Sequence, residues 1–296
     1  MSDSAVNLRR KIFTAGELKS VVRTMKAMAA SNIGHYEGAV SALKDYFWTV
    51  QLGLTACVRQ AQLLASSMGV EQKESGTIGA VVFGSEQGLV GQFNEVVADF
   101  VANSLKKFSD KKIVWAVGER IELALADVGL KSSRQYNLPN SISVITQLVG
   151  QILVDLEESR ERGEIVKVYL FYNQPVLGEI YVPTSQRLLP LDEVWLRSFT
   201  FNQWPTQNLP EVLNGMEQTV PAFLREYLFV SLFKACAESL ASENASRLAA
   251  MQRAEKNIDE LLIELNRTFY RLRQSVIDEE LFDVIAGFGL MSAFKK

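Results

Sequence analysis

The sequence has very little of the chemistry that metal and redox sites need. It contains one histidine, His35, and two cysteines, Cys57 and Cys236. Two cysteines cannot build a disulfide framework, and with one histidine they cannot assemble the common zinc-binding sets. We therefore predict no metal site and no cofactor, with a reducing compartment as the default.

Long apolar runs are also missing. The longest, such as residues 78–84, are far shorter than the roughly 20 apolar residues that a helix needs to cross a bilayer. The start, MSDSAVNLRRKI, contains no apolar segment of a secretory signal and leads directly into structure, so no cleaved leader is expected. We expect membrane contact only through partner subunits.

A general excess of positive charge is absent as well. The net charge of −3 gives no reason to expect nucleic-acid binding, which requires a basic surface. Charge is nevertheless uneven, because residues 8–26 carry six basic side chains against Glu17 alone. Such a segment either contacts an acidic partner surface or forms a solvated helix face.

Proline is missing from both ends of the chain. The first is Pro139, the other six lie between Pro175 and Pro221, and residues 222–286 contain neither proline nor glycine. Because proline breaks helix interiors, we expect long helices at both ends and no long helix in residues 170–221.

Both ends repeat apolar or small residues at alternating steps of three and four, which is the spacing of one helix face. Sustained over many turns, this spacing is typical of a coiled coil. The stripes have similar lengths and lie at opposite ends of one chain, so they predict an antiparallel pair of helices. They comprise Leu8, Ile12, Ala15, Leu18, Val22, Met25, Ala29, Ile33, Tyr36, Val40, Leu43, Phe47, Val50, Leu54 and Val58, and then Leu224, Leu228, Leu248, Met251, Ala254, Ile258, Leu261, Leu265, Phe269, Leu272 and Val276.

The middle of the chain alternates between strand-like and helix-like runs, which predicts βαβ units and a mostly parallel sheet. The segment after Tyr172 has a turn signal and a second extended run, and predicts an added hairpin at a sheet edge, where proline is tolerated. The strand-like runs are 78–83, 112–117 and 165–172, and the helix-like runs lie near 89–108, 119–128 and 142–161.

The predicted fold class is therefore α/β plus a long coiled coil. We expect an N-terminal coiled-coil helix over residues 1–67, a central α/β domain over 76–205 and a C-terminal coiled-coil helix over 208–296.

No active site is recognisable in the sequence. Residues 84–92, GSEQGLVGQ, follow a predicted strand, but they lack the glycine spacing of a phosphate loop, and the next lysine is Lys106. We interpret them as a tight turn at a helix start. His35 lies far from other titratable clusters, and neither Ser31 nor Ser85 has a nucleophile-elbow context.

Four segments resemble the gamma subunit of F-type ATP synthases. Residues 23–32, RTMKAMAASN, resemble its N-terminal signature, and residues 86–94, EQGLVGQFN, are similar to its D-R-G-L-C-G-G/S-x-N segment. Residues 242–257, SENASRLAAMQRAEKN, resemble S-E-x-x-A-R-M-x-A-M-x-x-A-x-x-N, and residues 270–285, YRLRQSVIDEELFDVI, resemble N-x-x-R-Q-a-x-I-T-x-E-L-x-E-I. The four occur in the family's order, and the resemblance covers essentially the whole chain.

The resemblance implies a fold and a function. In the family, the terminal helices form an antiparallel coiled coil inside a hexamer of alpha and beta subunits. A central Rossmann-like domain lies at the foot with the epsilon subunit and the membrane c-ring. Rotation of this non-catalytic shaft couples ion flow through the ring to ATP synthesis or hydrolysis. We then expect a peripheral protein at the cytoplasmic face of the cell membrane, from a bacterial or archaeal source.

The resemblance also implies site residues. Met25 falls at the family's coupling methionine and Arg23 at the basic residue before it. At each position the alternative is an ordinary coiled-coil charge or core residue. The expected contacts with beta subunits are Arg23, Met25, Glu243, Arg247, Arg273 and Gln274, and the expected foot contacts with the c-ring are Phe199, Phe201 and Asn202.

Several positions depart from the family pattern. Asn32 stands where a lysine is common, Val90 replaces a cysteine, and Asp278 replaces a threonine. Residues 199–203 depart from the family's Y-x-Y-E-P. These departures indicate a divergent branch.

Two alternatives remain open at this point. One is a small-molecule enzyme that binds a nucleotide in its α/β domain and dimerises through a helical arm. The other is a coiled-coil scaffold unrelated to ATP.

Overall fold

The computed structural model describes residues 3–65, 76–139, 141–190, 208 and 215–293. They form two compact parts. The paired-helix part combines the chain's beginning up to Met28 with its end from Leu248, and the α/β part comprises Ala29–Arg247. Two helices contribute to both parts, α1 (Asp3–Ala65) and α6 (Met216–Ala293).

In the paired-helix part, α1 and α6 run antiparallel. Lys19 pairs with Asp259, whereas Arg23, further along α1, pairs with Glu255, which comes earlier in α6. Part of each apolar stripe lies between the helices, with Ala15, Val22, Met251 and Ile258 buried together. Leu18 and Leu261, which the stripes also include, are exposed. The predicted antiparallel helix pair is confirmed for this part of the chain.

Helix α6 begins at Met216, so it includes Pro221, although proline placement predicts no long helix up to residue 221 and the predicted C-terminal coiled-coil segment starts at residue 208. Proline removes one backbone donor and is best tolerated near a helix start. Here it is close to the first residue, Met216, so the helix loses little.

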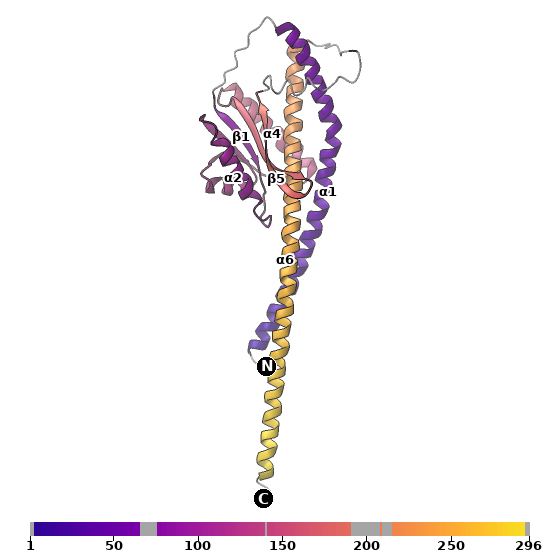
Figure 1. The fold of residues 1–296 in the computed structure, drawn as a ribbon, viewed down its shortest axis with the longest axis vertical. Helices are drawn as coiled ribbons and strands as arrows, with labels where there is room; N and C mark the ends of the chain where they lie inside the picture. Colours follow the sequence, from indigo (N-terminus) through magenta and orange to yellow (C-terminus); the bar gives the residue numbers. More distant parts are fainter. Residues whose placement is uncertain (1–2, 66–75, 140, 191–207, 209–214, 294–296) are drawn as a thin grey trace. The chain divides into compact units, whose positions relative to one another are not determined.

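The α/β part is built on a five-stranded sheet with the order β3-β2-β1-β4-β5 (Figure 1). Strands β1 to β4 run parallel to one another, and β5 is antiparallel to β4. The predicted mostly parallel sheet is therefore correct. The strands are β1 (Ile78–Phe83), β2 (Lys112–Val117), β3 (Ser132–Tyr136), β4 (Lys167–Val176) and β5 (Glu179–Leu189).

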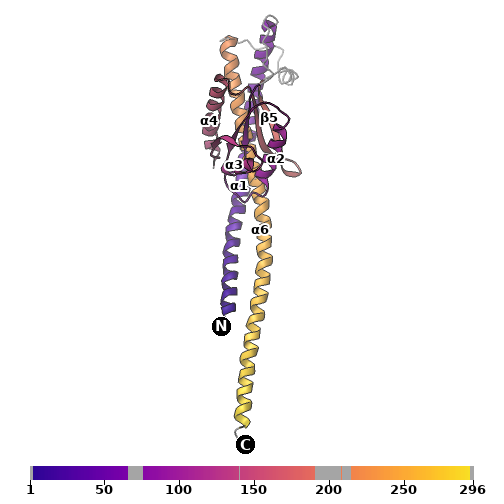
Figure 2. The same cartoon turned by 90° about the vertical axis from the view of Figure 1, so that its left-hand side faces the viewer.

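Helices cover both faces of this sheet. One face packs on α2 (Phe93–Leu105) and α3 (Glu119–Asp127). The other packs on α4 (Ile142–Glu161) and on the segments of α1 and α6 that belong to this part. Figures 1 and 2 show these α1 and α6 segments running side by side along the sheet. Because both faces are covered, β1 is buried along its whole length.

The predicted hairpin is present as β4 and β5, with β5 at the sheet edge. Its prolines lie where the ladder tolerates them. Pro183 is in the edge strand, opposite Asn173, and Pro175 coincides with an irregularity in the register between Gln174 and Val176.

Strand β3 is absent from the sequence prediction. Its residues, SSRQY, are polar, and only Tyr136 at its end is buried. As an edge strand it exposes most of its side chains, so it has neither the apolar run nor the alternation that reveals a strand.

Candidate functional site

The loop after β1 is held by its own polar groups. Ser85 N–H donates to Asn94 Oδ1 at 2.9 Å, Asn94 Nδ2 donates to Ser85 Oγ at 2.9 Å, and that hydroxyl donates to the Gln87 carbonyl. The Glu86 carboxylate accepts hydrogen bonds from the backbone N–H groups of Glu119 and Leu138. The loop is thus tied to α2, to the start of α3 and to the segment after β3.

Its backbone is that of a tight turn. Leu89 and Gly91 have positive φ angles of 64° and 63°, a region that residues other than glycine rarely adopt. At Gly84 a side chain would not fit, because a Cβ atom would lie 2.2 Å from Ile121 Cβ.

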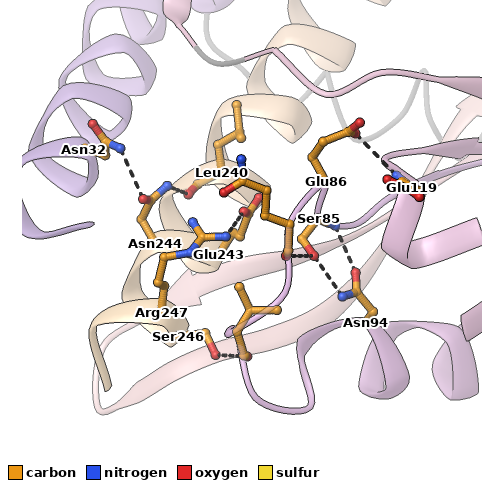
Figure 3. A network of polar contacts seen from close by, with 12 residues as sticks. Asn32, Ser85, Glu86, Asn94, Glu119, Leu240, Glu243, Asn244, Ser246 and Arg247 are labelled. Atoms are coloured by element: carbon orange, nitrogen blue, oxygen red, sulfur yellow. Dashed lines mark hydrogen bonds and ion pairs between the residues drawn. The ribbon is translucent and has the colours of Figure 1, made fainter. Parts of the chain in front are cut away.

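Helix α6 packs against this loop through a row of buried polar residues (Figure 3). Ser246 Oγ donates to the Val90 carbonyl at 2.5 Å. Two residues earlier, Asn244 Oδ1 accepts a hydrogen bond from Asn32 Nδ2 of α1 at 3.3 Å. Segments from three of the motifs, on α1, on the loop and on α6, therefore meet in the α/β part.

Glu243 and Arg247 form an ion pair at this place. Arg247 Nη2 donates to Glu243 Oε1 at 2.6 Å, and the two side chains are only 13% and 6% exposed. The other carboxylate oxygen, Oε2, is buried and has no hydrogen-bond partner among the described residues. Burial raises the pKa of Glu243 to about 6, against the opposing effect of Arg247. The sequence motif identified both residues but not their burial or their pairing.

Arg23 and Met25 lie in the paired-helix part. Arg23 Nε donates to Glu255 Oε1 at 2.7 Å, and Lys26 Nζ donates to Glu255 Oε2 at 2.5 Å. These hydrogen bonds, that of Arg23 above all, lower the pKa of Glu255 to about 2. Met25 is partly buried and packs on the cluster around Val22. Sequence reasoning missed Lys26 and Glu255, although both lie in the quoted motifs.

The other predicted contact residues are less constrained. Arg273 and Gln274 are exposed on α6, in the same part of the chain as Arg23. Phe199, Phe201 and Asn202 lie outside the described residues.

Other chemistry is sparse in the described residues. They contain no group of three or more His, Cys, Asp and Glu side chains that could hold a metal ion. None of the helices, so far as they are described, is long and apolar enough to span a membrane. Cys57 and Cys236 are buried free thiols, and burial raises the pKa of both.

Known proteins resemble this chain along almost all of its length. The family model "ATP synthase" matches residues 4–290. ATP synthase gamma chains of Polynucleobacter asymbioticus and Glaesserella parasuis are each 26% identical to it, and each alignment covers 96% of this chain and 98% of the relative. The gamma chain of Clostridium botulinum is 24% identical, covering 95% of this chain and 96% of that one.

Solved structures share the fold. A chain from the rotor of the Euglena gracilis mitochondrial ATP synthase superposes with a TM-score of 0.63 at 15% identity, covering 93% of this chain and 99% of that one. A chain from the central stalk and c-ring of the Tetrahymena thermophila mitochondrial ATP synthase gives 0.55 at 23% identity, covering 79% and 99%. Since the family model spans nearly the whole sequence, the chain belongs to the ATP synthase family.

Proposed function

We propose that this chain is the gamma subunit of an F-type ATP synthase. It is the central rotor shaft, which couples ion translocation through the membrane ring to ATP synthesis or hydrolysis in the alpha/beta head by rotation. The observation that carries this proposal is the length of the match, because the family model covers residues 4–290 and the gamma-chain relatives align over 95% or more of this chain. The small-molecule enzyme considered as an alternative does not fit this family.

The paired helices are suited to transmitting torque. The apolar contacts of Val22 and Met251 hold the two helices together along one face. At their margin, Glu255 binds both Arg23 and Lys26, which resists sliding of one helix along the other. A paired rod twists less under load than a single helix.

We propose that the chain carries no catalytic chemistry of its own. The loop after β1, the best candidate for a nucleotide site, uses Ser85, Glu86 and Asn94 to bind its own backbone and neighbouring elements. Polar groups occupied in this way support a structural loop.

The proposed partners are the alpha and beta subunits of the head, the epsilon subunit and the membrane c-ring. The Euglena and Tetrahymena chains belong to structures described as rotor, central stalk and c-ring assemblies. We place this chain at the cytoplasmic face of the cell membrane, peripheral, with membrane contact only through partner subunits.

The proposed contacts with the head are Arg23 and Met25 on α1, and Arg247, Arg273 and Gln274 on α6. Arg23 and the exposed Arg273 offer positive charge to an acidic surface. Glu243 belongs to the same set, although its carboxylate is buried. The foot contacts proposed for the c-ring remain Phe199, Phe201 and Asn202.

Reconstitution tests the proposed function. The isolated chain should hydrolyse no ATP, and adding it to alpha and beta subunits from the same source should restore rotation-dependent ATPase activity. With the membrane sector added, hydrolysis should drive ion pumping. ATP hydrolysis by the isolated chain, or a head whose activity is the same with and without it, would contradict the proposal.

A further inference from the structure

Arg247 depends on a single buried acid. In the part of the chain that the structure describes, its guanidinium forms an ion pair with Glu243 alone, at 2.6 Å. A guanidinium that is mostly removed from water is costly unless its charge is compensated. Neutralising Glu243 therefore removes the ion pair that holds the Arg247 guanidinium in its present position.

The surroundings of Glu243 favour neutralisation. Its side chain is 6% exposed, and the residues that the structure describes offer Oε2 no hydrogen-bond partner. The loop after β1 brings a second carboxylate, Glu86, whose negative charge opposes ionisation of Glu243. Tyr36 of α1 and Cys236 of α6 lie near enough for the charge of Glu243 to raise their pKa, and neither carries a positive charge. Arg247 is the only cation in this set.

We propose that Glu243 is a positioning residue that holds the Arg247 guanidinium against α6, and that a proton added to its free oxygen Oε2 releases Arg247 into solvent. The proton comes from water and converts the carboxylate to a neutral acid, which can no longer form the ion pair. Arg247 keeps its charge, because guanidinium does not deprotonate in proteins.

The consequence is a coupling contact that responds to acidification. This part of the inference rests on the proposed function, which makes Arg247 a contact with the head. Burial sets the pKa of Glu243 near 6, so the pair is intact at neutral pH and is lost as the pH falls below that value. Once it is released from Glu243, the Arg247 side chain adopts many conformations, so its charge no longer lies at one fixed position.

The isolated full-length chain tests the protonation itself. We would measure the melting temperature of wild type and of Glu243→Gln between pH 5 and pH 8. Because the folded chain binds this proton more tightly than the unfolded chain, wild type should lose stability relative to the variant as the pH rises to about 6, and level off above it. A difference that is constant over the whole range would overturn the proposal.

The reconstituted complex tests the release of Arg247. The measurement is ions pumped per ATP at pH 7.5 and at pH 5.5, for wild type, Glu243→Gln, Arg247→Ala and the double variant. Glu243→Gln should already show at pH 7.5 the lowered coupling that wild type reaches at pH 5.5, and it should add nothing to Arg247→Ala. The matched control is Glu238→Gln, which removes another buried glutamate of α6 that pairs with Lys234 instead. Its ratio to wild type should not change with pH.

The outcomes separate the two proposals. If Glu243→Gln lowers coupling equally at both pH values, and does so also in the Arg247→Ala background, Glu243 is only structural and the inference is wrong. If wild-type chain fails to reconstitute a coupled complex at all, the proposed function is wrong, and the melting profile still decides whether Glu243 takes up the proton.

Discussion

At the scale of single residues, the Glu255 carboxylate of α6 pairs with two positive charges of α1. It accepts hydrogen bonds from Arg23 and Lys26, and both cations lie three residues apart on α1. An exposed ion pair normally contributes little, because water and salt screen it. Here one carboxylate serves two donors, which fixes the angular position of α6 on α1 more than it stabilises the pair.

Glu255→Gln should remove an acid-dependent part of the stability. Because Arg23 and Lys26 lower the pKa of Glu255 to about 2, its ionised form stabilises the fold above the ordinary carboxyl pKa, and this stabilisation is lost as the pH falls through about 2. Melting curves from pH 2 to pH 7 should therefore converge for wild type and variant at the acid end. Added salt should shrink the difference at neutral pH.

The control for this variant is Glu260→Gln. Glu260 forms a looser pair with Lys256 at 3.9 Å within α6, and both side chains are well exposed. Its replacement should change the melting temperature little at any pH. If both substitutions change the melting temperature equally, the ion pairs between the helices contribute no more to stability than a pair within one helix.

Met25→Lys should weaken coupling more than assembly. Met25 is partly buried beside Val22 and Met251, and a lysine there brings an ammonium to the margin of the apolar seam. The long lysine stem can carry its charge outward, so the helices stay paired, but the surface offered to the head changes. We expect fewer ions pumped per ATP, with normal amounts of assembled complex.

Met28→Lys provides the comparison. Met28 is on the same helix and is 61% exposed, so the same charge enters without touching the seam. If both variants pump as many ions per ATP as wild type, Met25 has no special role in coupling.

At the residue scale, the sequence predicted the positions of Glu243 and Arg247 but not their surroundings. The motifs identified Glu243 and Arg247 as a pair of positions, because motif residues keep their spacing along a helix. They could not show that Glu243 is buried, or that it lies near Tyr36 and Glu86, which come from distant segments of the chain. Burial of a charge is decided by tertiary packing, and one sequence does not record it.

At the scale of elements, periodicity predicted most of the fold. The apolar steps along α1 and α6 and the buried runs of β1 and β2 are direct signals of helix and strand. β3 has no such signal, since a polar edge strand is specified by its neighbour β2 more than by its own residues. Proline placement predicted no long helix up to residue 221, but α6 includes Pro221, which stands so near the helix start that only one hydrogen bond is lost.

Gly84→Ala should destabilise the α/β part. The new methyl group would lie 2.2 Å from Ile121 Cβ and 2.7 Å from Asn94 Oδ1, so the contact between β1 and α3 must open. Overpacking of this kind typically costs about 1–3 kcal/mol. Denaturant unfolding of the isolated chain would measure it.

Gly88→Ala is the matched control in the same loop. A methyl group there meets only Arg120 Nη2, at 3.9 Å, and Gly88 has no positive φ. The variant should unfold as wild type does. Similar losses from both glycines would mean that the loop, and not the crowding at Gly84, determines the cost.

Leu261→Pro should break the paired helices locally. Leu261 is 46% exposed, so replacing its side chain costs little, whereas a proline in a helix interior costs about 3 kcal/mol or more. Amide hydrogen exchange should accelerate around residue 261, and coupling in the complex should fail. Leu261→Ala keeps the backbone donor and should leave both unchanged, and equal behaviour of the two variants would contradict a role for helix continuity.

At the scale of the whole molecule, the chain's ends make one part and its middle makes the other. The sequence predicted the antiparallel pairing of the ends, because two stripes of similar length have few other ways to cover one another. It also predicted the mostly parallel sheet that the middle of the chain forms. It did not reveal that residues 36–54 and 223–241 pack on that sheet, since a helix stripe shows which face is buried and not what buries it.

This division has a consequence for how the protein is made. The segment up to Met28 is synthesised before its partner, which begins at Leu248. At the usual speed of translation, the ribosome needs roughly 10 to 40 s to add the residues between them. During that time Ala15 and Val22 lack the residues of α6 that bury them. If translation stops before Leu248, these apolar residues stay exposed to solvent, where chaperones and proteases can bind them. A chain that lacks the segment from Leu248 onward therefore exposes apolar residues that the longer chain buries.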